Sequence, residues 1–106
     1  MRVELSSLAK KQVRKTVKYI DAKFGGKSRD KFMDEFSHTM YLLGINPYIG
    51  PIEPSLANRP IEYHSIVIAR INKAIYTVSD SIVKVIAFWD CRRNPKTLVA
   101  QVTDGK

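Results

Sequence analysis

Cysteine is almost absent from this sequence, and no long apolar run occurs in it. The 106 residues contain one cysteine, Cys91. A single cysteine can form neither an internal disulfide nor a metal site by itself, so we expect no metal and no other cofactor. The longest apolar run, Val85–Trp89, is far too short to span a bilayer, and residues 1–5 lack the apolar stretch of a signal peptide. These absences favour a single cytoplasmic domain over residues 1–106.

Acidic residues are also few. Ten Asp and Glu stand against eighteen Lys and Arg, which gives a net charge of +8 and a pI of about 9.8. The excess is spread along the chain: residues 1–44 carry ten positive and five negative side chains, and residues 45–106 carry eight and five. Such a field attracts polyanions. Composition alone does not distinguish nucleic acid, an acidic protein and an anionic membrane, and no zinc spacing, RNP-like strand or recognition-helix signature is present.

The first half of the chain has the pattern of two amphipathic helices. Over residues 6–24, apolar residues recur at steps of three and four and share one face, and Ser6 or Ser7 is the expected N-cap. Residues 28–43 repeat this pattern. Gly25-Gly26 lies between the two segments and accepts the left-handed conformation that ends a helix. The two helices should therefore pack as an antiparallel hairpin.

The second half is rich in Ile, Val, Tyr and Phe, which favour strands. Residues 46–60 hold four of the five prolines and predict a rigid, irregular connection. The expected strands cover residues 61–71, 74–78 and 82–89, the turns residues 72–73 and 79–81. Such tight links favour an antiparallel meander, with a short leading strand at residues 3–5 and a strand or helical turn at residues 97–102. The predicted fold class is α+β: an N-terminal helical hairpin packed on a small antiparallel β-sheet.

The last strand is apolar on both faces. Strict alternation places Val83, Val85, Ala87 and Trp89 on one face. The other face then carries Ile82, Ile86 and Phe88, interrupted by Lys84. A helical hairpin covers only one face of a sheet, so the second face must be covered by the C-terminal tail, by a second copy of the chain or by another protein.

Three segments of the second half resemble the strands of a known family. They are Tyr-His-Ser-Ile at 63–66, Ile-Tyr-Thr-Val-Ser-Asp at 75–80, and the segment 86–95 that ends in Cys-Arg-Arg-Asn-Pro. With the helical hairpin, this pattern resembles the RelE/ParE toxins of bacterial type II toxin–antitoxin systems, which include plasmid-stabilization modules. The motifs cover about residues 61–98, and the architecture covers most of the chain. The resemblance implies a toxin with a RelE/ParE-like fold.

Two positions depart from the family pattern. His64 and Thr77 stand where relatives often have arginine, which weakens a transfer of phosphate-binding roles. The tail after Pro95 contains neither tyrosine nor histidine, which several ribonuclease members use near the C-terminus. These departures put a RelE-like cutting site in doubt.

The first functional hypothesis implied by the resemblance is an mRNA interferase that cleaves messenger RNA on the ribosome. That chemistry needs a base for the ribose 2′-hydroxyl and cations for the phosphorane. Arg92 and Arg93, followed by Arg70, are the candidate phosphate ligands, because the guanidinium matches phosphate oxygens and stays charged. His64 is the candidate base, with Glu62 as an alternative.

RNA binding in this hypothesis uses residues outside the catalytic set. Lys11, Arg14, Lys18 and Lys73 are candidates for contacts to phosphates, and Tyr63 is a candidate for stacking on a base. Tyr63 has an ordinary structural alternative, because tyrosines in strands are more often packing residues.

The alternative hypothesis is a ParE-like inhibitor of DNA gyrase without nuclease activity, and a third is a degenerate, non-catalytic binding protein with the toxin fold. All three include a cognate antitoxin as a partner and no membrane. The charge of +8 suits an acidic ligand, and an uncovered apolar face would suit an amphipathic segment. We expect the antitoxin to cover Ile82, Ile86 and Phe88, or the Arg92–Arg93 edge, or both.

Overall fold

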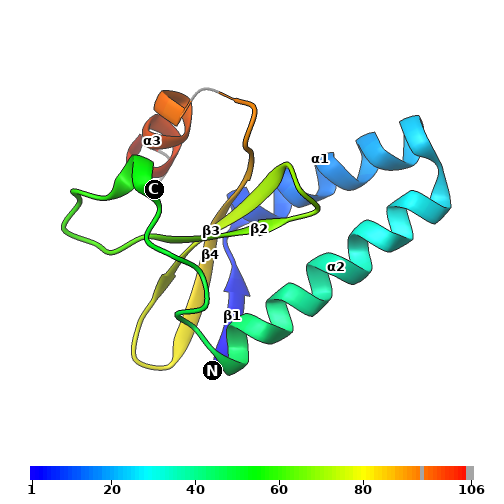
Figure 1. Ribbon diagram of the computed structural model, residues 1–106. Coiled ribbons are helices and arrows are strands. Elements are labelled where there is room, and N and C mark those ends of the chain that lie inside the picture. Colours follow the sequence, from blue (N-terminus) through cyan, green and yellow to red (C-terminus); the bar gives the residue numbers. More distant parts are fainter. Residues whose placement is uncertain (94, 105–106) are drawn as a thin grey trace.

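In the computed structural model, which describes residues 1–93 and 95–104, a four-stranded sheet lies between a helical hairpin and a short C-terminal helix (Figure 1). In chain order the elements are β1 (Arg2–Leu5), α1 (Ser7–Phe24), α2 (Gly26–Ile45), the 3-10 helix η1 (Pro54–Leu56), β2 (His64–Ile68), β3 (Asn72–Val78), β4 (Ile82–Asp90) and α3 (Pro95–Asp104). The α+β prediction, with the helices preceding the meander, is confirmed. Within the described ranges, no helix is long and apolar enough to cross a membrane.

The helical hairpin forms as its sequence predicts. Ser6 is the N-cap of α1, and its hydroxyl accepts a hydrogen bond from the Ala9 amide at 3.0 Å. A single residue, Gly25, links the helices; its φ of 92° lies in the region that glycine adopts without strain. Gly26 already belongs to α2, which begins two residues earlier and ends two residues later than expected.

The sheet is mixed, with strand order β1-β4-β3-β2. The predicted antiparallel meander of β2, β3 and β4 is confirmed. The leading strand also forms, and it pairs with β4 in parallel, with Arg2 opposite Ile82 and Leu5 opposite Val85. In the sequence, the helical hairpin, β2 and β3 therefore lie between two strands that are neighbours in the sheet.

The predicted turn at Asn72-Lys73 is wrong. Both residues belong to β3, and Asn72 is buried opposite Ile68. The chain turns instead at residues 69–71, where Ala69 and Arg70 take positive φ values of 53° and 71°. Those values are uncommon for residues other than glycine, asparagine and aspartate. The turn therefore falls where the local sequence does not indicate one.

The predicted faces of β4 are also wrong beyond Val85. Tyr76 pairs with Val85 and Ile75 pairs with Ala87, so Ile86 is an extra residue in β4. This bulge exchanges the two faces. Val83, Val85 and Phe88 lie in the core under the helical hairpin, whereas Ala87 and Trp89 lie in a second core on the opposite side.

The second face of the sheet is covered by the chain itself. Residues 97–102 belong to α3, and Leu98 of this helix is fully buried with Leu56 of η1 and Trp89. Val99 and Val102 pack on the same cluster. Of the three covers considered from the sequence, the C-terminal tail is the one observed.

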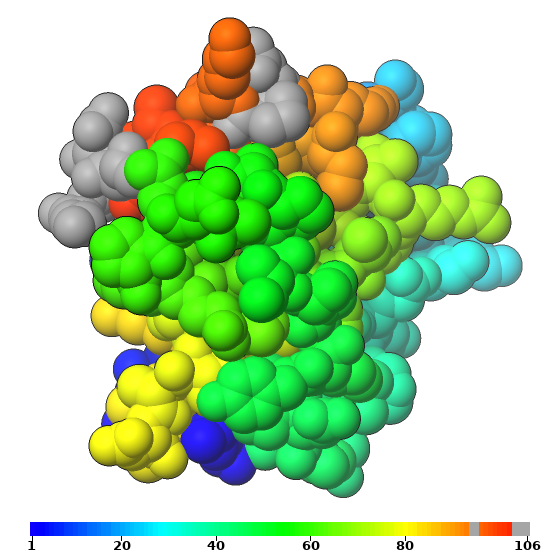
Figure 2. Space-filling view, turned by 60° about the vertical axis from the view of Figure 1, so that its left-hand side comes forward, coloured from blue at the N-terminus to red at the C-terminus, as the bar shows by residue number. Residues whose placement is uncertain are grey.

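The proline-rich segment spreads across the molecule between α3 and the β3–β4 turn (green in Figure 2). Its backbone is held at Gly50, whose amide donates a 2.9 Å hydrogen bond to the hydroxyl oxygen of the buried Tyr76. A Cβ at position 50 would lie 2.3 Å from the Ser65 carbonyl oxygen and 2.8 Å from the Tyr76 hydroxyl. Only glycine permits this close approach.

We expect Gly50→Ala to lower the free energy of unfolding by about 2–3 kcal/mol, because the added methyl group meets a backbone carbonyl that cannot move aside freely. Urea denaturation of the full chain measures this change. The matched control is Gly26→Ala in the first turn of α2, where a Cβ meets only the mobile end of Arg29. A loss for Gly50→Ala no larger than that of the control would contradict the prediction.

Candidate functional site

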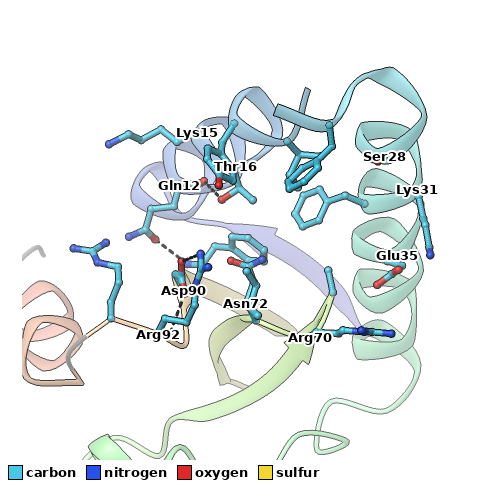
Figure 3. A pocket seen from close by; sticks show the side chains of 18 of the residues that line it. Gln12, Lys15, Thr16, Ser28, Lys31, Glu35, Arg70, Asn72, Asp90 and Arg92 are labelled. Atoms are coloured by element: carbon cyan, nitrogen blue, oxygen red, sulfur yellow. Dashed lines mark hydrogen bonds and ion pairs between the residues drawn. The ribbon is translucent and has the colours of Figure 1, made fainter. Parts of the chain in front are cut away.

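A cleft of about 1030 Å³ lies between the helical hairpin and the ends of the strands. Figure 3 shows side chains of α1 and α2 on one side of it, and Asn72 and Asp90 of the sheet with Arg92, which follows β4, on the other. We call it the cationic cleft. Its basic lining residues are Lys11, Lys15, Lys31, Arg70, Arg92 and Arg93. Its carboxylates are only Glu35 and Asp90 among the residues the structure describes, so the cleft suits an anionic ligand.

Arg92 stands at the end of β4 in a two-point ion pair with Asp90. Its Nε donates to Asp90 Oδ1 at 3.0 Å and its Nη2 donates to Oδ2 at 2.7 Å. The hydrogen bonds from Arg92 hold the pKa of the Asp90 carboxyl below its ordinary value. Asp90 is therefore an ionised carboxylate at neutral pH, and it occupies the guanidinium edge that a phosphate would otherwise use.

Arg93 and Arg70 reach the cleft without a direct ion pair to a carboxylate in the described part of the chain, although the charge of Arg93 also helps to lower the pKa of Asp90. The Arg93 guanidinium lies over the ring of the buried Trp89, 4.4 Å from its centroid, which fixes its plane while leaving its donors available. Arg70 projects from the β2–β3 turn and is exposed. The three predicted arginines therefore meet at one cleft.

His64 lies elsewhere. It is buried beneath the proline-rich segment, where its ring stacks on Tyr76 with centroids 5.5 Å apart. Nδ1 lies 2.8 Å from the Gly50 carbonyl oxygen and Nε2 lies 2.7 Å from Glu62 Oε2. Both ring nitrogens are therefore engaged by groups of the chain itself. Neither His64 nor Glu62 lines the cationic cleft.

The predicted nucleic-acid ligands are dispersed. Lys11 lines the cationic cleft, and Arg14 and Lys18 are exposed on α1 outside it. Tyr63 is 8% exposed and packs in the second core. Lys73 forms an ion pair with Glu53 at 2.6 Å. Tyr63 is therefore the packing residue that its ordinary alternative described, and Lys73 is held in an ion pair within the chain.

Glu53 is a residue that sequence reasoning missed. Its side chain is 2% exposed, and it also accepts hydrogen bonds from the Ser55 amide and hydroxyl. Burial raises the pKa of Glu53, but hydrogen bonds from Lys73, Ser55 and Ser65 outweigh it and hold the pKa below its ordinary value. A glutamate between prolines gives no local signal of this, because its partner is twenty residues further along.

Other cleft residues were also missed. Lys15 is four residues after Lys11 on α1, so helical periodicity could have placed it beside that residue. Lys31, Glu35 and Asn72 reach the cleft through tertiary packing of α2 and β3, for which the sequence has no local signal. No cluster of three metal-ligating side chains occurs among residues 1–93 and 95–104.

Comparison of the chain with known protein families and solved structures agrees with this architecture. A family model described as "ParE toxin of type II toxin-antitoxin system, parDE" matches residues 3–95. The fold is similar to that of a solved structure, "Chromosomal ParDE TA system from P. aeruginosa", with a TM-score of 0.68 and 12% identity, over 85% of this chain and 95% of that one. No curated protein matches significantly. The chain belongs to the ParE toxin family.

We expect Lys73→Met to destabilise the protein at pH 7 by on the order of 3 kcal/mol, since it leaves a buried carboxylate without its cation. Without Lys73, burial favours the neutral acid and should raise the pKa of Glu53 above the ordinary value of 4.5, so the deficit should begin to shrink as the pH falls through that raised pKa. Urea melts between pH 7 and pH 4 measure this. Adding Glu53→Gln should remove most of the pH dependence, and an equal deficit at both pH values would contradict the assignment.

Proposed function

We propose that this chain is the toxin of a toxin–antitoxin pair and that it acts by binding and inhibiting DNA gyrase, without cutting RNA. Membership of the ParE family supports the toxin assignment. Within the hypotheses that the resemblance allows, membership also favours gyrase over messenger RNA on the ribosome.

The separation of the candidate base from the candidate phosphate ligands carries this proposal. Arg70, Arg92 and Arg93 line the cationic cleft, whereas His64 is buried outside it with both ring nitrogens engaged. General base catalysis requires the base within hydrogen-bond reach of the hydroxyl that attacks. The four side chains assigned to cleavage therefore supply charge at one place and a base at another.

Asp90 is a poor substitute for the missing base. Its pKa is lowered by the hydrogen bonds from Arg92, and a carboxylate of low pKa takes a proton weakly. Glu35 is the other carboxylate of the cleft in the described residues, and it is exposed on α2. The cleft is better equipped to hold an anionic group than to transfer protons.

We propose the same cleft as the binding site of the antitoxin. The expectation that an antitoxin covers Ile82, Ile86 and Phe88 loses support in this fold, because Phe88 is 4% exposed under Phe32 and Phe36. Ile82 and Ile86 are partly buried, and Ile86 packs against the α3 core. The Arg92–Arg93 edge remains available. It adjoins exposed apolar side chains of the cleft, Tyr19 and Phe24 among them. An acidic amphipathic segment matches this combination.

The first test adds the purified chain to gyrase and relaxed plasmid. We expect supercoiling to stop and cleaved plasmid to accumulate, while transcripts on translating ribosomes stay intact. On induction in a bacterium, DNA synthesis and DNA-damage signalling should respond before protein synthesis. New transcript ends inside codons, with gyrase unaffected, would contradict the proposal and restore the ribonuclease hypothesis.

The second test concerns the antitoxin. We expect Arg70→Glu to slow association with the cognate antitoxin about tenfold at low salt, because a charge at the rim of an interface acts mainly on the association rate. Stopped-flow measurements at several salt concentrations detect this. Arg59→Glu makes the same charge change on an exposed loop outside the cleft. Equal slowing by both variants would show an effect of net charge alone and exclude the cleft as the binding site of the antitoxin.

A further inference from the structure

The outward side of α1 carries a dense cationic face. Lysine and arginine occur there at steps of three and four residues, so they lie on the same side of the helix. Its members are Lys10, Lys11, Arg14, Lys15 and Lys18, and all five are exposed. No acidic residue occurs in α1 before Asp21.

None of these five cations has a carboxylate partner among the residues that the structure describes. The ion pairs observed involve cations outside this face, such as Arg29 with Asp21 and Asp30, and Lys73 with Glu53. Like charges four residues apart, such as Lys10–Arg14 and Arg14–Lys18, destabilise a helix. The face therefore has an unfavourable electrostatic term that an anionic ligand would relieve.

The cationic face borders the cleft and shares Lys11 and Lys15 with it, but Lys10, Arg14 and Lys18 lie outside the cleft. The cleft combines cations with exposed aromatic rings, whereas Lys10, Arg14 and Lys18 follow one another along α1 with no large apolar side chain between them on that side. Burial of apolar surface is the dominant favourable term in most protein–protein association. Phosphate contacts require only charge and reach.

We propose that the cationic face of α1 binds the phosphate backbone of duplex DNA. The choice of DNA rests on the proposed function, because gyrase holds duplex DNA; the choice of phosphate rests on the face itself. From Lys10 to Lys18 the helix rises about 12 Å. Over that length a duplex presents about seven phosphates, counted on both strands at about 1.7 Å each. Binding of this kind is independent of base sequence.

The experiment is fluorescence anisotropy of a labelled 20-base-pair DNA duplex with the full chain, from 25 to 200 mM salt. The test variant combines Lys10→Gln, Arg14→Gln and Lys18→Gln, none of which lines the cationic cleft. The control variant combines Lys27→Gln, Arg59→Gln and Lys84→Gln, three exposed cations on other elements. Each variant removes three of the eight net charges and leaves +5, so the two differ only in position.

We expect the wild type and the control to bind with a steep salt dependence. Neutralising three phosphate contacts should reduce the slope of log K against log salt by about 2–3, since each contact contributes about 0.9. The test variant should bind at least about tenfold more weakly than the control at 50 mM salt. An equal loss in both variants would mean that net charge alone is responsible and would overturn the proposal.

Two further results would also overturn it. They are the absence of DNA binding by the wild type at 25 mM salt, and tighter binding to a duplex RNA of the same length. Gyrase is not part of this assay, so its outcome is distinct from that of the proposed function. The test variant can also be added to the separate gyrase assay. If it has lost DNA binding but still inhibits gyrase as strongly as the wild type, the cationic face binds DNA but is not needed for gyrase inhibition.

Discussion

The extra residue in β4 is the constraint on which the rest of the structure depends. Because Ile86 is not matched by a residue of β3, the alternation of side chains changes at this point, and Phe88 enters the core under the hairpin while Trp89 enters the core under α3. The side chain of Gln12, on α1, stabilises the altered strand. Its Oε1 accepts a 2.7 Å hydrogen bond from the Phe88 amide, and its Nε2 donates a hydrogen bond to Gln101 Oε1 of α3. One side chain thus joins both helical layers to the bulged strand, and the buried Trp89 then supports Arg93 at the cleft.

The elements of the fold could be predicted from the sequence because each has a strong local signal. The apolar repeat from Ala9 to Phe24 and the β-branched runs after the prolines are sufficient for a helical hairpin and a meander. The bulge could not be predicted, since both faces of β4 are apolar and a shift by one residue leaves the pattern plausible. The β2–β3 turn was misplaced for a related reason. Asn72 is a good turn residue in isolation, but here tertiary packing buries it and leaves Ala69 and Arg70 to adopt the positive φ values.

The candidate site was predictable only in part. Arg92 and Arg93 stand at the end of a strand and before a proline, a position from which side chains reach the rim of a sheet, and the structure brings them to the cleft with Arg70. His64 was selected for its chemistry rather than its position. Its partner Gly50 lies fourteen residues earlier in an irregular segment, and the sequence around His64 does not indicate that contact. The same holds for Lys73, whose charge is offset by a carboxylate twenty residues before it.

The parallel pairing of β1 with β4 has a consequence for the order in which the chain folds. Ser6 and Ile86, which are joined by a hydrogen bond next to this pairing, are eighty residues apart in the sequence. The contacts of the hairpin and of the meander are local by comparison, and local contacts form with a smaller loss of chain entropy. We therefore expect β1 to join the sheet last, so that the open edge of β4 is the strand edge most exposed to incorrect pairing while the newly made protein folds.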